Sequence, residues 1–405
     1  MPQPLAQRLS TAVRRWRHHE FWPAWLFYLP LIPWCGLLSI RHRSVLAFLA
    51  ANPGIEKGGG WVNESKASIL EGLRASAAGR SSVLAHRLIP AGAAAEARAA
   101  HAARLIEGDA ELGGYPVILK PDAGQRGFAV RLAQRAEHLL PYFQANTRAV
   151  LLQKYHAGPH ECGILWVRSP LPSSLGAADG ASADRPPLSP PRGRGNASAA
   201  SGFIFAITRK TFPVIEGDGR STLRELVLKD DRLRCQSTVF FSRWADQLTR
   251  VLGEGERLRL AEAGNHCQGT VFSDGSDLVT PALEAVIDEI AGGFHGPDGD
   301  GQRSGHASPL DFGRFDLRYD SDELLRQGQG FAIVELNGTS SEATNLYDPS
   351  RGLVWAYGIL FRQWAHLYRL GAARVREGWP RMSLANLHAE MRAQFENRPG
   401  SPISD

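Results

Sequence analysis

The segments Gly-Arg-Phe-Asp-Leu-Arg at residues 313–318 and Phe-Ala-Ile-Val-Glu-Leu-Asn-Gly at residues 331–338 decide the fold of this chain. Both mix polar and apolar residues in the alternating way that is typical of a β-strand, because successive side chains of a strand point to opposite faces. The linker between the two segments is polar and ends at Gly330. We therefore expect two strands that pair in antiparallel fashion.

One face of this strand pair would carry a dense polar set. Arg314 and Asp316 lie two residues apart on the first strand, and Glu335 and Asn337 lie two residues apart on the second, so each pair shares a face. Pairing would bring Asp316, Glu335 and Asn337 together as three oxygen ligands of the kind that Mg²⁺ takes beside a triphosphate. An ordinary sheet with one solvated polar face is the alternative that the strand pair alone leaves open.

The composition is that of a globular protein with a large core. The chain has 405 residues, of which 43% are hydrophobic and 21% charged, and its formal net charge is +5. A chain of this length usually forms more than one packed unit, and its basic residues are not interleaved with aromatic ones as on a nucleic-acid surface. The cysteines are widely separated and form no Cys-x-x-Cys pair, which argues against a disulfide framework or a thiolate zinc site and fits a reducing compartment.

The apolar run at residues 21–40 is the main clue to localisation. It is long enough to span a bilayer and holds aromatic residues suited to a membrane interface, but three prolines interrupt it: Pro23, Pro30 and Pro33. Arginines flank the run on both sides and no small-residue cleavage site follows it, so we expect no cleavable signal peptide. Three readings stay open: a proline-broken element lying in the membrane interface, a core or packing helix, or a true span.

A strand-like segment at residues 115–121 delivers Lys120 at its end, and a loop with Gly124 and Gly127 follows. Glycine-bearing loops let backbone N–H groups close around phosphate oxygens, while a lysine at the end of the strand neutralises charge. The segment is not a Walker loop, since no Gly-Lys-Ser/Thr precedes a helix. A β-hairpin with an exposed lysine is the alternative reading.

Three longer stretches organise the rest of the chain. Residues 169–201 are dominated by Ser, Pro, Gly and Ala and lie between strand-like segments, so we expect a disordered insertion inside one domain. Residues 292–308 predict a second extended loop. From Leu353 to Tyr368, apolar residues recur with the three-four spacing of an amphipathic helix, which we expect to pack as core support.

In their order along the chain these segments resemble the ATP-grasp superfamily, and in particular its D-alanine–D-alanine-ligase-like, carboxylate–amine ligase branch. The resemblance covers residues 80 to 370 or so. It implies an α+β ATP-grasp fold, in which two subdomains hold ATP between antiparallel sheets, beside a small N-terminal α/β unit. The implied division is a basic tail and hydrophobic segment (1–43), an N-terminal unit (44–110), the ATP-grasp domain (111–375) and a C-terminal tail (376–405).

The resemblance also assigns roles to residues. Those implied to contact the nucleotide are Lys120 (phosphates), Gly124 and Gly127 (lid loop), Gln153 (adenine amino group, where glutamate is frequent), Lys154 and Tyr155 (backbone hinge) and Glu161 (ribose). Those implied to act on the reacting groups are Lys210, with Arg209 as the alternative, and Arg314. Those implied to hold metal are Asp316, Glu335 and Asn337, with two Mg²⁺ ions expected and Mn²⁺ as an alternative.

The acceptor substrate is expected at a polar loop that follows the predicted strand with Glu335 and Asn337. Related enzymes hold it where this chain has Thr339, Ser340 and Ser341. A second polar loop, around His266, suggests a further substrate or phosphate contact, with a well-bonded turn as the alternative.

The implied activity is that of a ligase that uses ATP and Mg²⁺ to join a carboxylate to an amine through an acyl phosphate, releasing ADP and phosphate. The alternatives are an ATP-grasp phosphotransferase and a nucleotide-binding scaffold at a membrane surface with little turnover. The expected partners are small-molecule or peptide carboxylates and amines, with no nucleic acid, and a membrane surface contacted through residues 21–40. Because ATP is required, the catalytic part is expected in the cytoplasm, associated with the inner face of a membrane.

Overall fold

The computed structural model describes residues 13–124, 129–169, 202–261, 264, 266, 269–296 and 310–396. Gly127 of the predicted lid loop lies outside the described residues. So do residues 170–201 of the predicted insertion, most of the predicted loop at 292–308, and Cys267. The three described cysteines, Cys35, Cys162 and Cys235, are free thiols.

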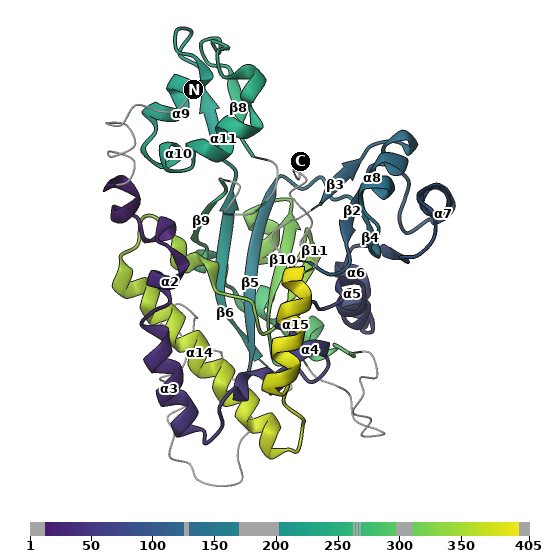
Figure 1. Cartoon of the computed structure of the whole chain (residues 1–405), viewed down its shortest axis with the longest axis vertical. Helices are drawn as coiled ribbons and strands as arrows, with labels where there is room; N and C mark the ends of the chain where they lie inside the picture. The colour runs from purple at the N-terminus through teal and green to yellow at the C-terminus, as the bar shows by residue number, and fades with distance from the viewer. Residues whose placement is uncertain are drawn as a thin grey trace.

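A five-stranded antiparallel sheet forms the centre of the molecule (Figure 1). Its strands, in spatial order, are β11 (Phe331–Asn337), β10 (Phe312–Tyr319), β5 (His160–Arg168), β6 (Gly202–Thr211) and β9 (Val271–Asp274). The predicted antiparallel pairing of the two strands that open the sequence is confirmed. The linker between them is longer than a tight turn and contains the short helix α13 (Asp322–Arg326).

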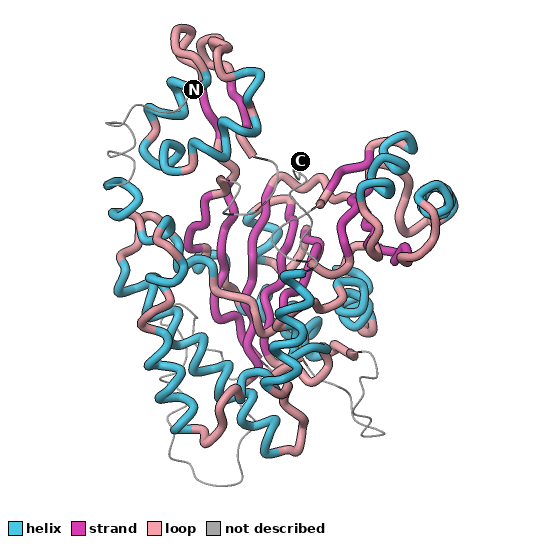
Figure 2. The backbone as a smooth tube through the Cα atoms, in the orientation of Figure 1, coloured by secondary structure: helices cyan, strands magenta, loops and turns pink. Residues whose placement is uncertain are grey.

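A second antiparallel sheet stands beside the first (Figure 2). Its order is β1 (His86–Ile89), β4 (Val150–Lys154), β2 (Val117–Pro121) and β3 (Arg131–Ala133). Helices α7 (Ala95–Gly108) and α8 (Leu139–Ala145) share an apolar core with this sheet. Because β1 pairs with β4, the sheet crosses the predicted domain boundary between residues 110 and 111, and residues 86–110 are part of the same packed unit as the strands that follow.

A small unit lies at the top of the molecule in Figure 1. It combines the β-hairpin of β7 (Val214–Glu216) and β8 (Arg257–Arg259) with helices α9 (Leu223–Lys229), α10 (Asp231–Cys235) and α11 (Ser237–Arg243). Thr222 and Glu225 form a reciprocal capping box at the start of α9, which satisfies two backbone N–H groups that the helix leaves unpaired.

Helices cover both faces of the central sheet. On one face, α12 (Pro281–Gly292), α5 (Lys66–Arg74) and α6 (Ala77–Ser82) bury apolar side chains against alternate residues of the strands. On the other, α14 (Leu353–Arg376) packs on the apolar end of the strands around Leu165 and Val167. The predicted amphipathic helix is thus confirmed and continues past Tyr368, and its stripe forms core.

The N-terminal apolar run folds into short pieces that lie along α14 (Figure 1). They are the 3₁₀ turn His19–Phe21, α2 (Ala24–Phe27) and α3 (Leu31–Arg41), with Pro23 and Pro30 at the two helix starts. Of the helices described, none has the length and apolar character needed to cross a membrane. The remaining short elements are α4 (Glu56–Gly60) and α15 (Leu384–Glu396).

Candidate active site

Three neighbouring strands of the central sheet place a charged cluster on one face. The residues that share this face are Arg314, Asp316 and Arg318 on β10, Glu161 and Gly163 on β5, and Lys210 on β6. Asp316 lies opposite Gly163, and Glu161 lies opposite both Arg318 and Lys210. The cluster occupies the end of the face that α14 leaves uncovered, so the same alternation that builds the core at one end presents charge at the other.

Asp316 is the centre of the cluster. Its carboxylate accepts hydrogen bonds from Arg314 Nε at 3.1 Å and Arg314 Nη2 at 3.3 Å, and it lies 3.1 Å from Lys210 Nζ. Burial raises the pKa of Asp316, but the positive charges of Arg314 and Lys210 outweigh it, so the pKa is lowered and the carboxylate stays charged.

Lys210 has a second anionic partner in Glu161, whose Oε1 lies 2.8 Å from Lys210 Nζ. The lysine side chain is almost fully buried, which lowers its pKa, yet the Asp316 and Glu161 carboxylates together raise it above the ordinary value. Arg318 Nη2 approaches the other oxygen of Glu161 at 3.6 Å. Glu161, predicted to bind ribose, is therefore bonded within the charged cluster.

Gly163 makes room for this arrangement. A Cβ atom at this position would lie 3.0 Å from Arg314 Cδ and 3.1 Å from Asp316 Oδ1, which is tighter than ordinary contact. The residue was not among those predicted from the sequence. The order of the strands places Gly163 opposite Asp316 on the neighbouring strand. Strand order is a long-range feature that local sequence patterns do not predict.

The predicted metal residues are brought together. Asp316 faces Glu335 across the β10–β11 pair, Arg314 faces Asn337, and Asn337 donates its Nδ2–H to Asp316 Oδ2 at 3.3 Å. In the part of the chain that the structure describes, no group of three or more His, Cys, Asp and Glu side chains could hold a metal. A metal here would depend on two carboxylates and an amide, a set that fits Mg²⁺ with several retained waters.

A β-bulge joins the two sheets at this site. The register of the β10–β11 pair shifts after Asp316, so Val334 has no cross-strand partner. Its carbonyl oxygen instead accepts hydrogen bonds from Lys120 Nζ at 3.2 Å and Gln153 Nε2 at 3.0 Å, both from the second sheet. The side chains of Lys120 and Gln153 are therefore held against β11.

Two buried side chains of the second sheet, those of Lys120 and Gln153, have unusual environments. Burial lowers the pKa of Lys120 from 10.5 to about 8, although the nearby Glu335 carboxylate opposes the shift. The Oε1 atom of Gln153 is buried and accepts no hydrogen bond from any of the residues that the structure describes. An acceptor left unpaired costs roughly 1–3 kcal/mol, and a donor such as an amino group would recover that cost.

Lys66 was not predicted as a site residue from the sequence, but it contacts two residues that were, Gly124 and Glu335. It begins α5, and its Nζ donates to the Gly124 carbonyl at 2.5 Å and lies 3.7 Å from Glu335 Oε1. The side chain thereby ties the predicted lid loop to the predicted metal strand. Asp122 of the same loop receives the Ala67 backbone N–H at 2.8 Å, which fixes the loop at the start of the helix.

The hinge residues lie at the end of β4. Lys154 is the last residue of the strand, and its backbone N–H donates to Ala85 at 2.9 Å, so that N–H is already used within the protein. Its side chain is exposed, and Tyr155 is half-buried.

The predicted acceptor loop packs on a glycine run. Thr339 Oγ1 donates to Gly58 O at 2.7 Å, and Ser341 Oγ donates to Gly338 O at 2.6 Å, so both hydroxyls are bonded to backbone. Ser340 is exposed. Gly338 and Gly59 pass so closely that a Cβ on Gly338 would lie 2.1 Å from Gly59 O. The loop is thereby fixed at the end of β11.

His266 is bonded to the N-terminal segment. Its Nε2 lies 2.8 Å from Glu20 Oε2, and its ring packs against Phe21, Phe272 and Tyr347. The residue is thus surrounded by protein contacts, which favours the well-bonded turn over the substrate contact among the two readings of this loop.

A second connection between the N-terminal segment and the acceptor loop is made by Glu342. Tyr28 OH donates to its two carboxylate oxygens at 3.0 and 3.1 Å and lies 2.7 Å from Tyr347 OH. Burial raises the pKa of Glu342, against the opposing effect of the two tyrosine hydroxyls and Arg314. Arg314 Nη1 donates to the Glu342 carbonyl at 3.2 Å, so this link reaches the charged cluster.

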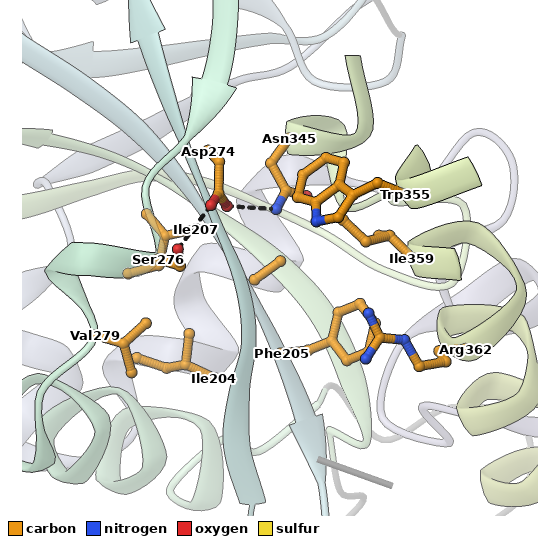
Figure 3. A pocket seen from close by; sticks show the side chains of 11 residues that line it. Ile204, Phe205, Ile207, Asp274, Ser276, Val279, Asn345, Trp355, Ile359 and Arg362 are labelled. Atoms are coloured by element: carbon orange, nitrogen blue, oxygen red, sulfur yellow. Dashed lines mark hydrogen bonds between the residues drawn. The ribbon is translucent and has the colours of Figure 1, made fainter. Parts of the chain in front are cut away.

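A separate pocket lies between β6, β9 and α14 (Figure 3). Asp274 points toward Ser276 and Asn345, accepting the Ser276 hydroxyl at 2.7 Å and the Asn345 amide at 3.0 Å, while Trp355 and Arg362 lie on the α14 side. None of the predicted site residues lines it.

No family model matches the chain, and no curated protein matches it. Similar solved structures include a bifunctional glutathione synthetase from Pasteurella multocida (11% identity, TM-score 0.35, 75% of this chain and 38% of that one). They also include a D-alanine–D-alanine ligase from Bacillus anthracis (10%, 0.35, 78% and 68%). A third is the ATP-grasp ligase PsnB, in complex with a precursor variant, Mg and ADP (11%, 0.32, 74% and 58%).

The chain resembles ATP-grasp ligases. The predicted α+β class is confirmed by the antiparallel sheets and the helices packed on them. The chain spans well under half of the glutathione synthetase.

Proposed function

We propose that this protein is an ATP- and Mg²⁺-dependent ligase that joins a carboxylate to an amine through an acyl phosphate. The observation that carries the proposal is the meeting of opposite charges where the two sheets join. Lys120 comes from one sheet, and Lys210, Arg314, Asp316 and Glu335 come from the other. Cations that can hold phosphates thereby lie beside carboxylates that can hold a divalent metal.

The nucleotide would bind between the sheets. Lys120 and Lys210 would hold its phosphates, and Gln153 Oε1 would accept a hydrogen bond from the adenine amino group. Because the Lys154 N–H is already bonded to Ala85, the backbone of Tyr155 would supply the hinge donor. Lys66 would hold the Gly124 loop over the phosphates and keep water out.

Asp316, Glu335 and Asn337 would hold Mg²⁺, which offsets the charge that develops on the phosphates. An oxygen of the substrate carboxylate attacks the γ-phosphorus, the bond from that phosphorus to the bridging oxygen breaks, and ADP leaves. The amine then attacks the acyl carbon, and phosphate leaves with the former carboxylate oxygen as the amine loses a proton. Arg314 would stabilise the transferred phosphoryl group and orient Asp316.

The substrates would be small-molecule or peptide carboxylates and amines, received near the fixed loop at residues 338–342. Consumption of ATP makes the cytoplasm the expected compartment.

Calorimetric titration with a non-hydrolysable ATP analogue, with and without Mg²⁺, tests the nucleotide site. We expect Mg²⁺-dependent binding that Glu335→Gln weakens at least about tenfold, equivalent to about 1.4 kcal/mol, with little change in melting temperature because the Glu335 side chain is 28% exposed. Glu96→Gln, an exposed carboxylate on α7, is the matched control and should bind as the wild type does. A folded wild type that fails to bind the analogue overturns the proposal.

A second measurement separates ligation from phosphotransfer. ADP release is followed with carboxylates alone, with amines alone and with both together. A ligase releases ADP and inorganic phosphate in proportion when both substrates are present. Release with a single alcohol or amine, together with a stable phosphorylated product, would assign the site to phosphotransfer.

A further inference from the structure

The N-terminal helices carry an apolar face that nothing in the described structure covers. The large apolar side chains exposed on α2, on α3 and on the turn between them are Trp25, Leu29, Ile32, Leu37 and Ile40, with exposed fractions from 52% to 77%. We call this set the outer face. In Figure 1, α3 lies at the left margin of the lower part of the molecule, with α14 beside it.

The outer face follows the helical repeat of α3. Ile32, Gly36 and Ile40 are four residues apart, as are Pro33, Leu37 and Arg41, and all of them are exposed. The opposite side of the same helix is also apolar, because Leu31 and Leu38 are buried against α14 and Trp34 donates its Nε1–H to Phe361 O at 3.0 Å. A helix that is apolar all round usually has partners on all sides. Here one side is left without a partner among the residues that the structure describes.

The charged residues of the segment that carries the outer face are of one sign. The sequence has no Asp or Glu between Glu20 and Glu56, whereas Arg41 and Arg43 stand exposed at the end of α3. Arg15 and Arg17 are exposed just before the segment. A second copy of the chain docked on this face would bring arginines toward arginines, while an anionic surface would complement them.

The dimensions fit a helix that lies on a bilayer. α3 has 11 residues, so it is about 16 Å long, roughly half the thickness of the hydrocarbon core. The exposed Trp16 and Trp25 are side chains that settle at the headgroup level. Apolar side chains and arginines on one short helix are typical of an interfacial element.

We propose that the outer face of α2 and α3 binds the surface of a membrane that contains anionic lipid. Of the three readings of residues 21–40, this one combines the interfacial element with the packing helix, since one side lies on α14 and the other on lipid. The same segment reaches the candidate site, because Tyr28 donates to Glu342 and Arg314 donates to the Glu342 carbonyl. Membrane binding would therefore hold the predicted acceptor loop, which ends at Glu342, close to the lipid surface.

Flotation of the full-length protein with lipid vesicles tests this. We expect binding to phosphatidylcholine vesicles that contain phosphatidylglycerol, weaker binding to phosphatidylcholine alone, and loss of the difference at high salt. The variant Ile32→Ser, Leu37→Ser, Ile40→Ser should reduce the bound fraction at least about tenfold. Arg41→Gln with Arg43→Gln should remove the preference for anionic lipid.

A matched control replaces three exposed aliphatic residues elsewhere: Val214→Ser, Val251→Ser, Leu384→Ser. It should float as the wild type does, and the melting temperatures of all variants report whether they fold. Failure of the wild type to bind either vesicle overturns the proposal, as does equal binding by the triple α3 variant. Light scattering after size exclusion is the second readout: a dimer that the α3 variant turns into a monomer, without vesicle binding, would assign the face to a second copy.

Discussion

Lys120 of one sheet donates its Nζ–H to the carbonyl oxygen of Val334 in the other, at 3.2 Å. The acceptor is free because a β-bulge removes Val334 from the β10–β11 ladder. A positive charge from the second sheet is thereby placed next to Asp316 and Glu335, with its pKa depressed to about 8 mainly by burial. The candidate site is thus built from both sheets, and the charge that Lys120 brings to it depends on pH.

This depressed pKa predicts a pH dependence of nucleotide binding. Phosphates bind the ammonium form of Lys120, and above about pH 8 that form is a minority in the free protein, so binding must take up a proton. We expect the affinity for the ATP analogue to fall about tenfold between about pH 7 and about pH 9. Titrations in buffers of different ionisation enthalpy measure the proton uptake directly.

Lys120→Arg is the control for this effect, because a guanidinium does not lose its proton in this range. If it folds, its affinity should be nearly independent of pH. In the absence of ligand the sign for stability is opposite. The folded pKa lies below the unfolded one, so the free energy of unfolding rises with pH between about 8 and 10.5. A wild-type affinity that does not change with pH would contradict the role of Lys120.

Gly163→Ala is expected to disturb the charged cluster by crowding Arg314 and Asp316. The added Cβ would lie 3.0–3.1 Å from Arg314 Cδ and Asp316 Oδ1 and displace both side chains. Overpacking of this kind costs roughly 1–3 kcal/mol, and we expect most of it as weaker nucleotide binding. Gly358→Ala on α14 is the matched control. Nothing lies within 4 Å of its Cβ position, so binding should be unchanged and stability unchanged or slightly higher.

Lys66→Met should loosen the predicted lid loop. The substitution removes the hydrogen bond to Gly124 O and the approach to Glu335, so we expect the affinity for the ATP analogue to fall about tenfold, or roughly 1.4 kcal/mol. Protease sensitivity near residue 124 should rise in parallel. Lys57→Met removes a lysine that forms an ion pair with Glu390 in α15, and this variant should bind normally. Equal losses in both variants would show a general effect of charge.

The candidate site was predictable from sequence only where its parts are local. Alternation put Arg314 and Asp316 on one face of the first strand and Glu335 and Asn337 on one face of the second, because side chains two residues apart share a face. The expected antiparallel pairing then brought Asp316, Glu335 and Asn337 together, as the structure has them. Lys120 at the end of its strand followed from the same kind of pattern. The α+β class was an implication of the resemblance to the ATP-grasp superfamily.

What the sequence did not give depends on contacts between distant segments. Gly163 belongs to the site because β5 lies between β10 and β6, and Lys66 because α5 packs beside β11. The bulge at Val334 shifts the register by one residue, which alternation cannot reveal. His266 offered polar chemistry in a loop, yet Glu20, more than 200 positions away, is its partner.

Tyr28→Phe should report on the link between the N-terminal segment and the acceptor loop. It removes a hydroxyl that donates to the buried carboxylate of Glu342, so the free energy of unfolding should fall by about 1–3 kcal/mol. The pKa of Glu342 is already raised by burial, so its contribution to stability weakens as the pH rises through that pKa. Loss of the Tyr28 hydrogen bond should raise the pKa of Glu342 further, so the free energy of unfolding should fall by a larger amount as the pH rises. Urea unfolding of Tyr28→Phe, Glu342→Gln and the double variant measures the coupling, and strictly additive losses would show that the two side chains act independently.

Replacement of residues 169–201 by Asn-Gly should leave nucleotide binding intact. Arg168 and Gly202, the ends of β5 and β6, lie directly opposite each other in the antiparallel register, and Asn-Gly supplies the turn that joins such ends. The junction lies five residues along β5 from Gly163, about 17 Å from the charged cluster. Affinity for the ATP analogue should therefore stay within about twofold, under roughly 0.5 kcal/mol. A tenfold loss in a variant that melts at the wild-type temperature would mean that the segment itself contributes to the site.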